Sequence, residues 1–336
     1  MREILGQQRE KDIYDPERDG TIEHEGDLHV LKAVIEAARE ADAAAREGRE
    51  MKEGTPRVAL FILPGVIRGA YGGGQVTALH EAGLRNGFSV IVGASTGAPI
   101  GAYLASGQPR MGTTIFSEEC TTADFIRLKR LPDGHAEDAQ FLADVFRGLT
   151  DKALDIEAIR KGRPDLIITA TDQDTGETKL FDAKKEGRDI VELIRASITM
   201  PVLCREPVLI DGRLYVDGGI YGPMPIREIV EAYDPTHILV LANSPKKYEH
   251  SALFRHLKDA GSHFVSEGLG QAMRHMDGKF GEEFAELRAL EIPSLIFWSD
   301  TAVRAFTKDP EIIQAGAERA EEDMKSMLEN AQNLCA

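Results

Sequence analysis

The sequence predicts an α/β fold in which a mostly parallel sheet is covered by helices on both faces. Two observations predict it. Short apolar runs typical of buried strands recur along the 336-residue chain, and segments with helical spacing separate them. The runs are continuously apolar rather than alternating, as expected of parallel strands that are buried on both faces. Apolar residues make up 42% of the chain, which is enough for a sizeable core.

The first element expected is a helix within residues 27–51, ahead of the alternating pattern. Its apolar stripe has helical spacing: Leu28, Leu31, Val34 and Ile35. The second half is almost entirely alanine, glutamate and arginine, so we expect it to project or to cover an edge. Residues 1–56 are therefore predicted to form a polar N-terminal extension with a helix, and residues 57–336 a single α/β domain.

Strands and helices alternate through the rest of the chain. The expected strands are residues 57–63, 88–95, 165–172, 178–183, 206–210, 213–219, 237–243 and 294–299. The expected helices are residues 74–84, 97–107, 139–149, 189–198, about 252–276 and about 309–332. No linker rich in proline, glycine or serine divides the sequence after residue 56.

The charge and the cysteine content of the chain limit which classes of function, and which cellular compartment, are expected. Forty Lys and Arg residues stand against 56 Asp and Glu, a formal net charge of -16, which argues against nucleic acid as a partner. This charge leaves room for peripheral contact with a membrane only through an apolar patch. Cys120, Cys204 and Cys335 are widely spaced, so neither a disulfide framework nor a zinc site is expected. The N-terminus is charged and has no apolar segment typical of a signal peptide, which favours a cytoplasmic protein.

One serine stands in a pattern typical of a nucleophile. Gly93-Ala94-Ser95-Thr96-Gly97 fits G-x-S-x-G and lies between an expected strand and an expected helix. A serine at such a sharp turn has a strained backbone, and glycines two residues away avoid clashes with the turn. The same pattern also occurs in ordinary tight turns, so a catalytic interpretation needs a base.

Two kinds of residue are candidates for this base: one of the late histidines, or one aspartate. The late histidines are His237, His250, His256, His263 and His275. His237 opens a strand and the others lie in or beside a helical segment, so no local signal supports a Ser-Asp-His triad, although the chemistry permits one. Asp217, before Gly218 and Gly219, ends an apolar strand. Its carboxylate would accept the proton of Ser95 effectively near pH 7 only if burial raised its pKa.

Three segments in this order resemble the patatin-like phospholipase family. They are the loop from Ile62 to Tyr71, the Gly93–Gly97 motif, and Asp217-Gly218-Gly219, which IRASITMPVLCREPV precedes and PMPI follows. The resemblance covers roughly residues 57–245. The phrases YLASGQP and ATDQDTGETKLFD are similar to those of its bacterial cytoplasmic branch.

The resemblance implies a three-layer patatin-like fold and a serine acyl-ester hydrolase. By it, Ser95 is the nucleophile and Asp217 the base of a dyad without histidine, and an acyl-enzyme forms and is hydrolysed. The expected activity is that of a phospholipase A, a lysophospholipase or an esterase in lipid degradation, acting on a lipid or small acyl ester. No cofactor or metal is implied.

The oxyanion loop departs from the family pattern, which is usually Gly-Gly-Gly-x-Arg/Lys-Gly. This chain has Pro64, which lacks an N–H group, and the β-branched Val66, whereas Arg68 and Gly69 match. The oxyanion role is therefore carried over only to Gly65 and Val66. Losing one oxyanion donor typically costs about 100- to 1,000-fold in rate, so a patatin-fold pseudo-enzyme or lipid-binding protein is the alternative.

A phosphate-binding module is a further alternative of a different class. A strand, a glycine-rich turn with Gly72, Gly73 and Gly74, and a helix would suit a phosphate at the helix N-terminus. The spacing fits neither G-x-G-x-x-G directly after the strand nor a G-K-[ST] motif, and this interpretation leaves Ser95 and Asp217 without a role.

Overall fold

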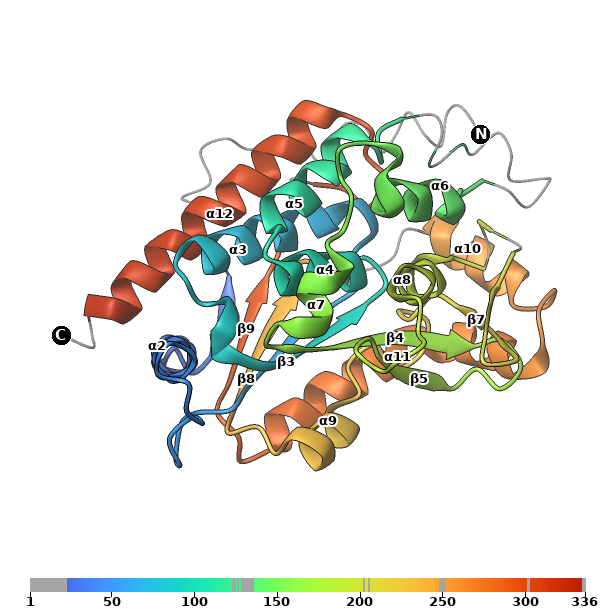
Figure 1. Ribbon diagram of the computed structural model, residues 1–336. Helices are drawn as coiled ribbons and strands as arrows, with labels where there is room; N and C mark the ends of the chain where they lie inside the picture. Colours follow the sequence, from blue (N-terminus) through green and yellow to red (C-terminus); the bar gives the residue numbers. More distant parts are fainter. Residues whose placement is uncertain are drawn as a thin grey trace.

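In the computed structural model, a central β-sheet lies between helices on its two faces (Figure 1). The structure describes residues 23–122, 125, 127, 136–201, 203–204, 206–247, 252–300 and 303–333. Residues 1–22 of the predicted extension, Cys335 and His250 lie outside the described residues.

Strands from both halves of the chain form one sheet in the order β1-β9-β8-β2-β3-β4-β7-β6, with β5 also paired to β4. Their bounds are β1 His24–Gly26, β2 Val58–Ile62, β3 Phe88–Ala94, β4 Asp165–Asp172, β5 Thr178–Asp182, β6 Val208–Ile210, β7 Arg213–Val216, β8 His237–Ala242 and β9 Ser294–Trp298. The five central strands, β9 to β4, are parallel to one another. Antiparallel pairing is confined to β1, β5, β7 and β6. The predicted mostly parallel sheet is confirmed.

Helices cover both faces of this sheet. Their bounds are α2 His29–Glu47, α3 Gly69–Glu81, α4 Gly97–Ser106, α5 Pro109–Glu118, α6 Ala139–Asp144, α7 Ile156–Lys161, α8 Ile190–Ile198, α9 Ile226–Tyr233, α10 Ala252–Gly261, α11 Glu267–Ala289 and α12 Pro310–Asn333. Side chains alternate along β2, so Val58, Leu60 and Ile62 join a core with α2, α3, α4, α8 and α12. Ala59 and Phe61 pack on the opposite face in a core with α9 and α11.

Several helices differ from the expected pattern. Helices α5, α7 and α9 and strand β1 were not predicted, because each is short and its apolar periodicity spans few residues. The long segment expected at about 252–276 is instead two helices, α10 and α11, separated at residues 262–266. Helix α3 begins at Gly69 rather than at residue 74, so Gly72, Gly73 and Gly74 lie inside it.

The glycines in α3 are explained by close packing. A Cβ atom on Gly74 would overlap the carbonyl oxygen of Ala317 in α12, and one on Gly73 would lie 2.8 Å from the Thr113 hydroxyl oxygen in α5. In Figure 1 these three helices lie together above the sheet. The glycine run therefore lets helices approach one another and does not form a phosphate-binding turn.

The N-terminal elements are packed against the rest of the structure. Strand β1 pairs with β9, and the alanine-rich half of α2 is packed rather than projecting, since Ala37, Ala38, Ala41 and Ala44 are buried. The division into residues 1–56 and 57–336 stays a prediction. No helix within the described ranges is long and apolar enough to cross a membrane.

Candidate active site

Ser95 lies on a strained turn between β3 and α4. Its φ is +53°, a left-handed conformation that is uncommon for a residue other than glycine. A Cβ atom on Gly93 would come within 2.5 Å of the carbonyl oxygen of Gly97, and one on Gly97 would overlap the carbonyl oxygen of Ile62 in β2. The two flanking glycines thus let the turn fold tightly against the neighbouring strand, as the spacing predicts.

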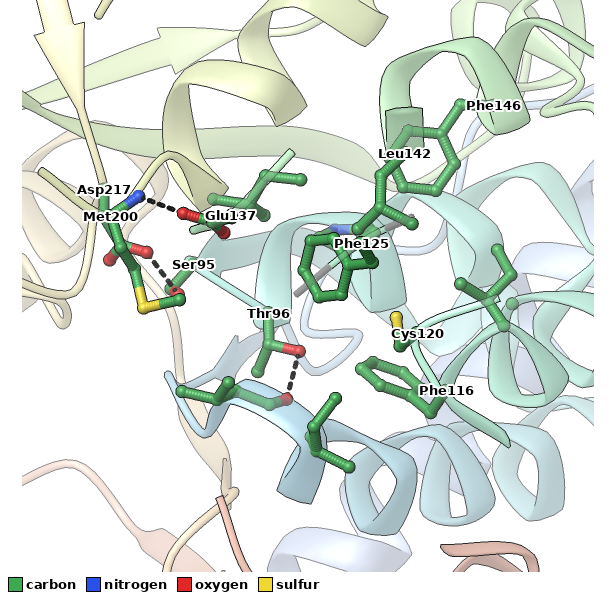
Figure 2. A pocket seen from close by; sticks show the side chains of 16 residues that line it. Ser95, Thr96, Phe116, Cys120, Phe125, Glu137, Leu142, Phe146, Met200 and Asp217 are labelled. Carbon is green, nitrogen blue, oxygen red and sulfur yellow. Dashed lines mark hydrogen bonds between the residues drawn. The ribbon is translucent and has the colours of Figure 1, made fainter. Parts of the chain in front are cut away.

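The fold brings Ser95 and Asp217 into direct contact, although 122 residues separate them. The Ser95 hydroxyl donates a hydrogen bond of 2.7 Å to Oδ2 of Asp217, and both residues are buried (Figure 2). The other oxygen of Asp217, Oδ1, accepts a hydrogen bond of 2.6 Å from the backbone N–H of Gly219. A Cβ atom on Gly218 would overlap the carbonyl oxygen of Thr169 in β4, so this glycine lets the Asp217 turn close on the sheet.

A single segment at the end of α8 holds both residues in place. The Ser197 hydroxyl accepts a hydrogen bond of 2.9 Å from the backbone N–H of Ser95. The carbonyl oxygens of Ser197 and Thr199 accept hydrogen bonds from the backbone N–H groups of Gly218 and Asp217. This segment is the IRASITMP stretch, whose anchoring role no local pattern revealed.

The environment of Asp217 makes it a better base than a solvated aspartate. Burial raises the pKa of Asp217 from 3.8 to about 6, against the opposing effect of the hydrogen bonds from Ser95 and Gly219. A carboxylate with this pKa is ionised at neutral pH and still basic enough to accept a proton during a reaction.

The loop after β2 carries a second strained residue. Val66 has a φ of +55°, which is rare for a β-branched side chain. Neither the N–H of Gly65 nor that of Val66 donates a hydrogen bond to another described residue. The N–H of Thr96, which follows Ser95 and precedes α4, likewise donates no hydrogen bond to another described residue. Three backbone N–H groups of this loop and of the serine turn thus have no acceptor among the described residues in spite of Pro64, and Val66 and Thr96 line the same cavity as Ser95. Thr96 was not predicted as a donor.

Contacts from four directions hold this loop in its strained shape. Arg68, buried at 6% exposure, donates from Nε to the carbonyl oxygen of Gly65 at 3.3 Å. The N–H of Ile67 donates to the carbonyl oxygen of Ala305 at 3.2 Å, and Thr96 Oγ1 donates to that of Val66 at 3.0 Å. Arg68 therefore acts on the shape of the loop through the Gly65 carbonyl group.

Asn243 supplies the fourth anchor, from the end of β8. Its Nδ2 donates to the carbonyl oxygen of Leu63 at 2.7 Å, and its Oδ1 accepts from the N–H of Gly72 at 3.0 Å. A Cβ atom on Gly65 would lie 2.6 Å from the Asn243 carbonyl oxygen, so the glycine is needed for this contact. Asn243 lies where the strand order reverses between β2 and β8, the usual position of sites in such sheets. The fold was needed to show its role.

A largely apolar cavity opens beside the serine (Figure 2). Its polar lining residues are Ser95, Thr96, Glu137 and Asp217, and most of the others are apolar, among them Phe116, Phe125, Leu142, Phe146 and Ile198. This apolar lining has the chemical character that an acyl chain would contact if its carbonyl group lay at Ser95.

The described late histidines lie away from this cavity. None of His237, His256, His263 and His275 is among its lining residues. His237 stands at the amino-terminal end of β8, opposite Val58, whereas the cavity lies beyond the carboxyl ends of the strands. The geometry therefore favours Asp217 over these histidines as the partner of Ser95.

Comparison with protein families identifies one stretch of the chain. Residues 65–230 match the profile of the family described as patatin-like phospholipase. This stretch of the chain is a patatin-like phospholipase domain by that match. The match spans the oxyanion loop, the serine motif and the aspartate turn, and it supports lipid acyl hydrolysis as the class of activity. A search of curated protein sequences found no match.

Three solved structures illustrate the similarity to known proteins. VipD from Legionella pneumophila is 13% identical, with a TM-score of 0.45 over 84% of this chain and 69% of VipD. Pseudomonas aeruginosa ExoU, in complex with SpcU, is 15% identical, with a TM-score of 0.41 over 82% of this chain and 53% of that one. Human GIVD cytosolic phospholipase A2 in complex with methyl gamma-linolenyl fluorophosphonate is 13% identical, with a TM-score of 0.44 over 90% and 63%.

Proposed function

We propose that this chain is a serine carboxylic-ester hydrolase that cleaves acyl esters of lipids or related small esters through an acyl-enzyme. The observation that carries the proposal is the buried hydrogen bond of 2.7 Å from the Ser95 hydroxyl to Asp217, at the end of an apolar cavity. A nucleophile in contact with a base, next to available backbone donors, is the arrangement that acyl transfer requires.

The first half of the reaction forms the acyl-enzyme. Asp217 Oδ2 accepts the Ser95 proton while Oγ attacks the ester carbonyl carbon, and the carbonyl oxygen becomes an oxyanion. Backbone N–H groups of Gly65, Val66 and Thr96 are assigned to stabilise that charge, assisted by the N-terminus of α4. The carbon–oxygen bond to the alcohol then breaks, and Asp217 returns its proton to the leaving alkoxide oxygen.

The second half releases the acid. A water molecule attacks the Ser95 acyl ester as Asp217 accepts its proton, and a second tetrahedral oxyanion forms in the same place. When this intermediate collapses, Ser95 leaves with the proton held by Asp217, and the fatty acid departs. Asp217 serves as base and acid in turn, a role for which a pKa of about 6 is suited near neutral pH.

Strain in the oxyanion loop supports the alternative of an impaired hydrolase that mainly binds lipid. Val66 is held at a φ of +55°, where a β-branched residue is disfavoured. In the hydrolase proposal, the hydrogen bonds of Arg68 and Asn243 hold the loop in this strained conformation. The N–H groups of Gly65 and Val66 then remain available to the oxyanion. The two proposals differ in whether the loop stabilises an oxyanion.

Hydrolysis of p-nitrophenyl esters of short, medium and long acyl chains tests both proposals. We expect turnover by the wild type and losses of at least about 1,000-fold for Ser95→Ala and Asp217→Asn, with folding checked by circular dichroism. Equal inactivity of all three proteins would refute the hydrolase. In that case the Pro64→Gly, Val66→Gly double variant separates the alternatives, since activity gained there would identify the loop as the defect.

A further inference from the structure

A second buried carboxyl group lines the same cavity as the proposed dyad. Glu137 lies just before α6 and is 2% exposed. In Figure 2 it extends into the cavity beside Ser95 and Asp217, whereas Phe146 lies toward the far end. Asp217 lines the same cavity, and its negative charge raises the pKa of Glu137. The proposed reaction gives Glu137 no task.

One oxygen of Glu137 is fixed and the other is available. Oε2 accepts a hydrogen bond of 2.8 Å from the backbone N–H of Met200, and the backbone N–H of Glu137 donates to the carbonyl oxygen of Leu203 at 3.1 Å. Oε1 makes no hydrogen bond to any residue that the structure describes. The carboxyl group is therefore held in one orientation, and it retains an oxygen without a partner among the described residues in a largely apolar cavity.

The surroundings of Glu137 favour its neutral form. Burial raises the pKa of Glu137 well above 4.5, and the negative charges of Asp217 and Asp138 act in the same direction. The hydrogen bond from Met200 acts in the opposite direction and is the smaller effect. A neutral carboxylic acid both donates and accepts hydrogen bonds, so it pairs well with a hydroxyl or a carbonyl group.

An unsubstituted acyl chain would be a poor partner for this group. Such a chain would displace water from the cavity and leave the carboxyl group without a second hydrogen bond, which is unfavourable for a buried polar group. A chain with an oxygen atom at the right position would complete the pairing. Because Glu137 lies at the end of the cavity nearest Ser95, that oxygen must be within a few carbons of the ester carbonyl group.

We propose that Glu137 is a specificity-determining residue that selects acyl chains carrying a hydroxyl group close to the ester carbonyl. This inference rests on the proposed function, since it takes the cavity as the acyl site. It names the substrate class as esters of 2- or 3-hydroxy acids. A site built to hydrogen-bond a substrate hydroxyl discriminates strongly against the analogue that lacks it.

The test compares p-nitrophenyl hexanoate with the corresponding 2-hydroxy and 3-hydroxy esters, each enantiomer separately. We expect the wild type to favour one hydroxy ester by about 10- to 100-fold in kcat/KM. Glu137→Leu should remove this preference, so that plain and hydroxy esters have equal kcat/KM in that variant, whereas Glu137→Gln, which keeps a neutral hydrogen-bonding group, should retain most of the preference. Glu119→Gln is the matched control, because Glu119 is also buried but is not among the cavity-lining residues.

Binding separates failure of this inference from failure of the proposed function. Ser95→Ala, alone and combined with Glu137→Leu, would be titrated with hexanamide and the 2- and 3-hydroxyhexanamides in a calorimeter. If no ester is hydrolysed but a hydroxy amide binds more tightly and the double variant loses this difference, selection by Glu137 stands without hydrolysis. Equal kcat/KM for plain and hydroxy esters, or a preference that survives Glu137→Leu, overturns the selection while hydrolysis stands. Absence of both turnover and differential binding overturns both.

Discussion

Replacing Asp217 with asparagine should stabilise the protein at alkaline pH. The carboxyl group is buried, and its pKa rises from 3.8 to about 6 on folding, which corresponds to about 3 kcal/mol of lost stability once it is ionised in both states. Asparagine has the same shape and no charge, and its Oδ1 can still accept the hydrogen bond from Gly219. The expected gain is therefore up to about 3 kcal/mol at pH 8, and it accompanies the loss of activity.

The gain should depend on pH in a defined direction. Between pH 3.8 and about 6 the folded protein binds more protons at Asp217 than the unfolded chain, so wild-type stability falls as pH rises through this window. The advantage of Asp217→Asn is thus full above about pH 6 and shrinks toward zero as pH falls to 3.8. With an unfolding entropy of about 2.1 cal/mol/K per residue, 3 kcal/mol corresponds to about 4 °C in Tm for this chain.

Calorimetric melting of the wild type and the variant from pH 4.5 to pH 8 measures this difference. Other buried acids, such as Glu283, are present in both proteins and cancel in the comparison. Asp211→Asn is the matched control, since Asp211 is exposed in the turn before β7, and it should leave Tm almost unchanged. A variant that melts at or below the wild-type temperature at pH 8, or a gain that does not vary with pH, would refute the reasoning.

Three further predictions concern the site and its supports. In the wild type, kcat/KM should rise as pH increases through about 6, where Asp217 becomes ionised; a flat profile from pH 5 to pH 8 would argue against it as the base. Urea unfolding should show that Gly97→Ala lowers the free energy of unfolding by more than about 3 kcal/mol, because the new Cβ atom overlaps a backbone oxygen. Gly278→Ala, at an open position in α11, should raise it by up to about 1 kcal/mol, and equal stabilities of the two variants would contradict the close approach at Gly97. Asn243→Ala should lower kcat at least about 10-fold with a smaller change in KM, because the residues on either side of the oxyanion loop, Leu63 and Gly72, each lose a hydrogen bond; unchanged kinetics would contradict a positioning role for Asn243.

All strands of the sheet except β1 were predicted from the sequence, because local residue patterns specify them. A buried strand needs only a short apolar run, and β4 at Asp165–Asp172 has the predicted bounds. The turn at Ser95 is coded in the same way, since Gly93 and Gly97 are needed within two residues of it. Asp217 was found through a motif resemblance rather than through periodicity. Its hydrogen bond to Ser95 could be examined only in the folded chain.

By itself, the sequence determined the α/β class, the order of most strands and helices, and the two residues proposed for the chemistry. The tertiary structure alone decided that Gly72, Gly73 and Gly74 pack helices, that Val66 adopts a positive φ, and that Asn243 and Glu137 belong to the site. The physical reason is the distance along the sequence over which the residues interact. Local patterns fix local conformation, whereas burial, pKa shifts and hydrogen bonds between distant segments arise only when packing brings those segments together.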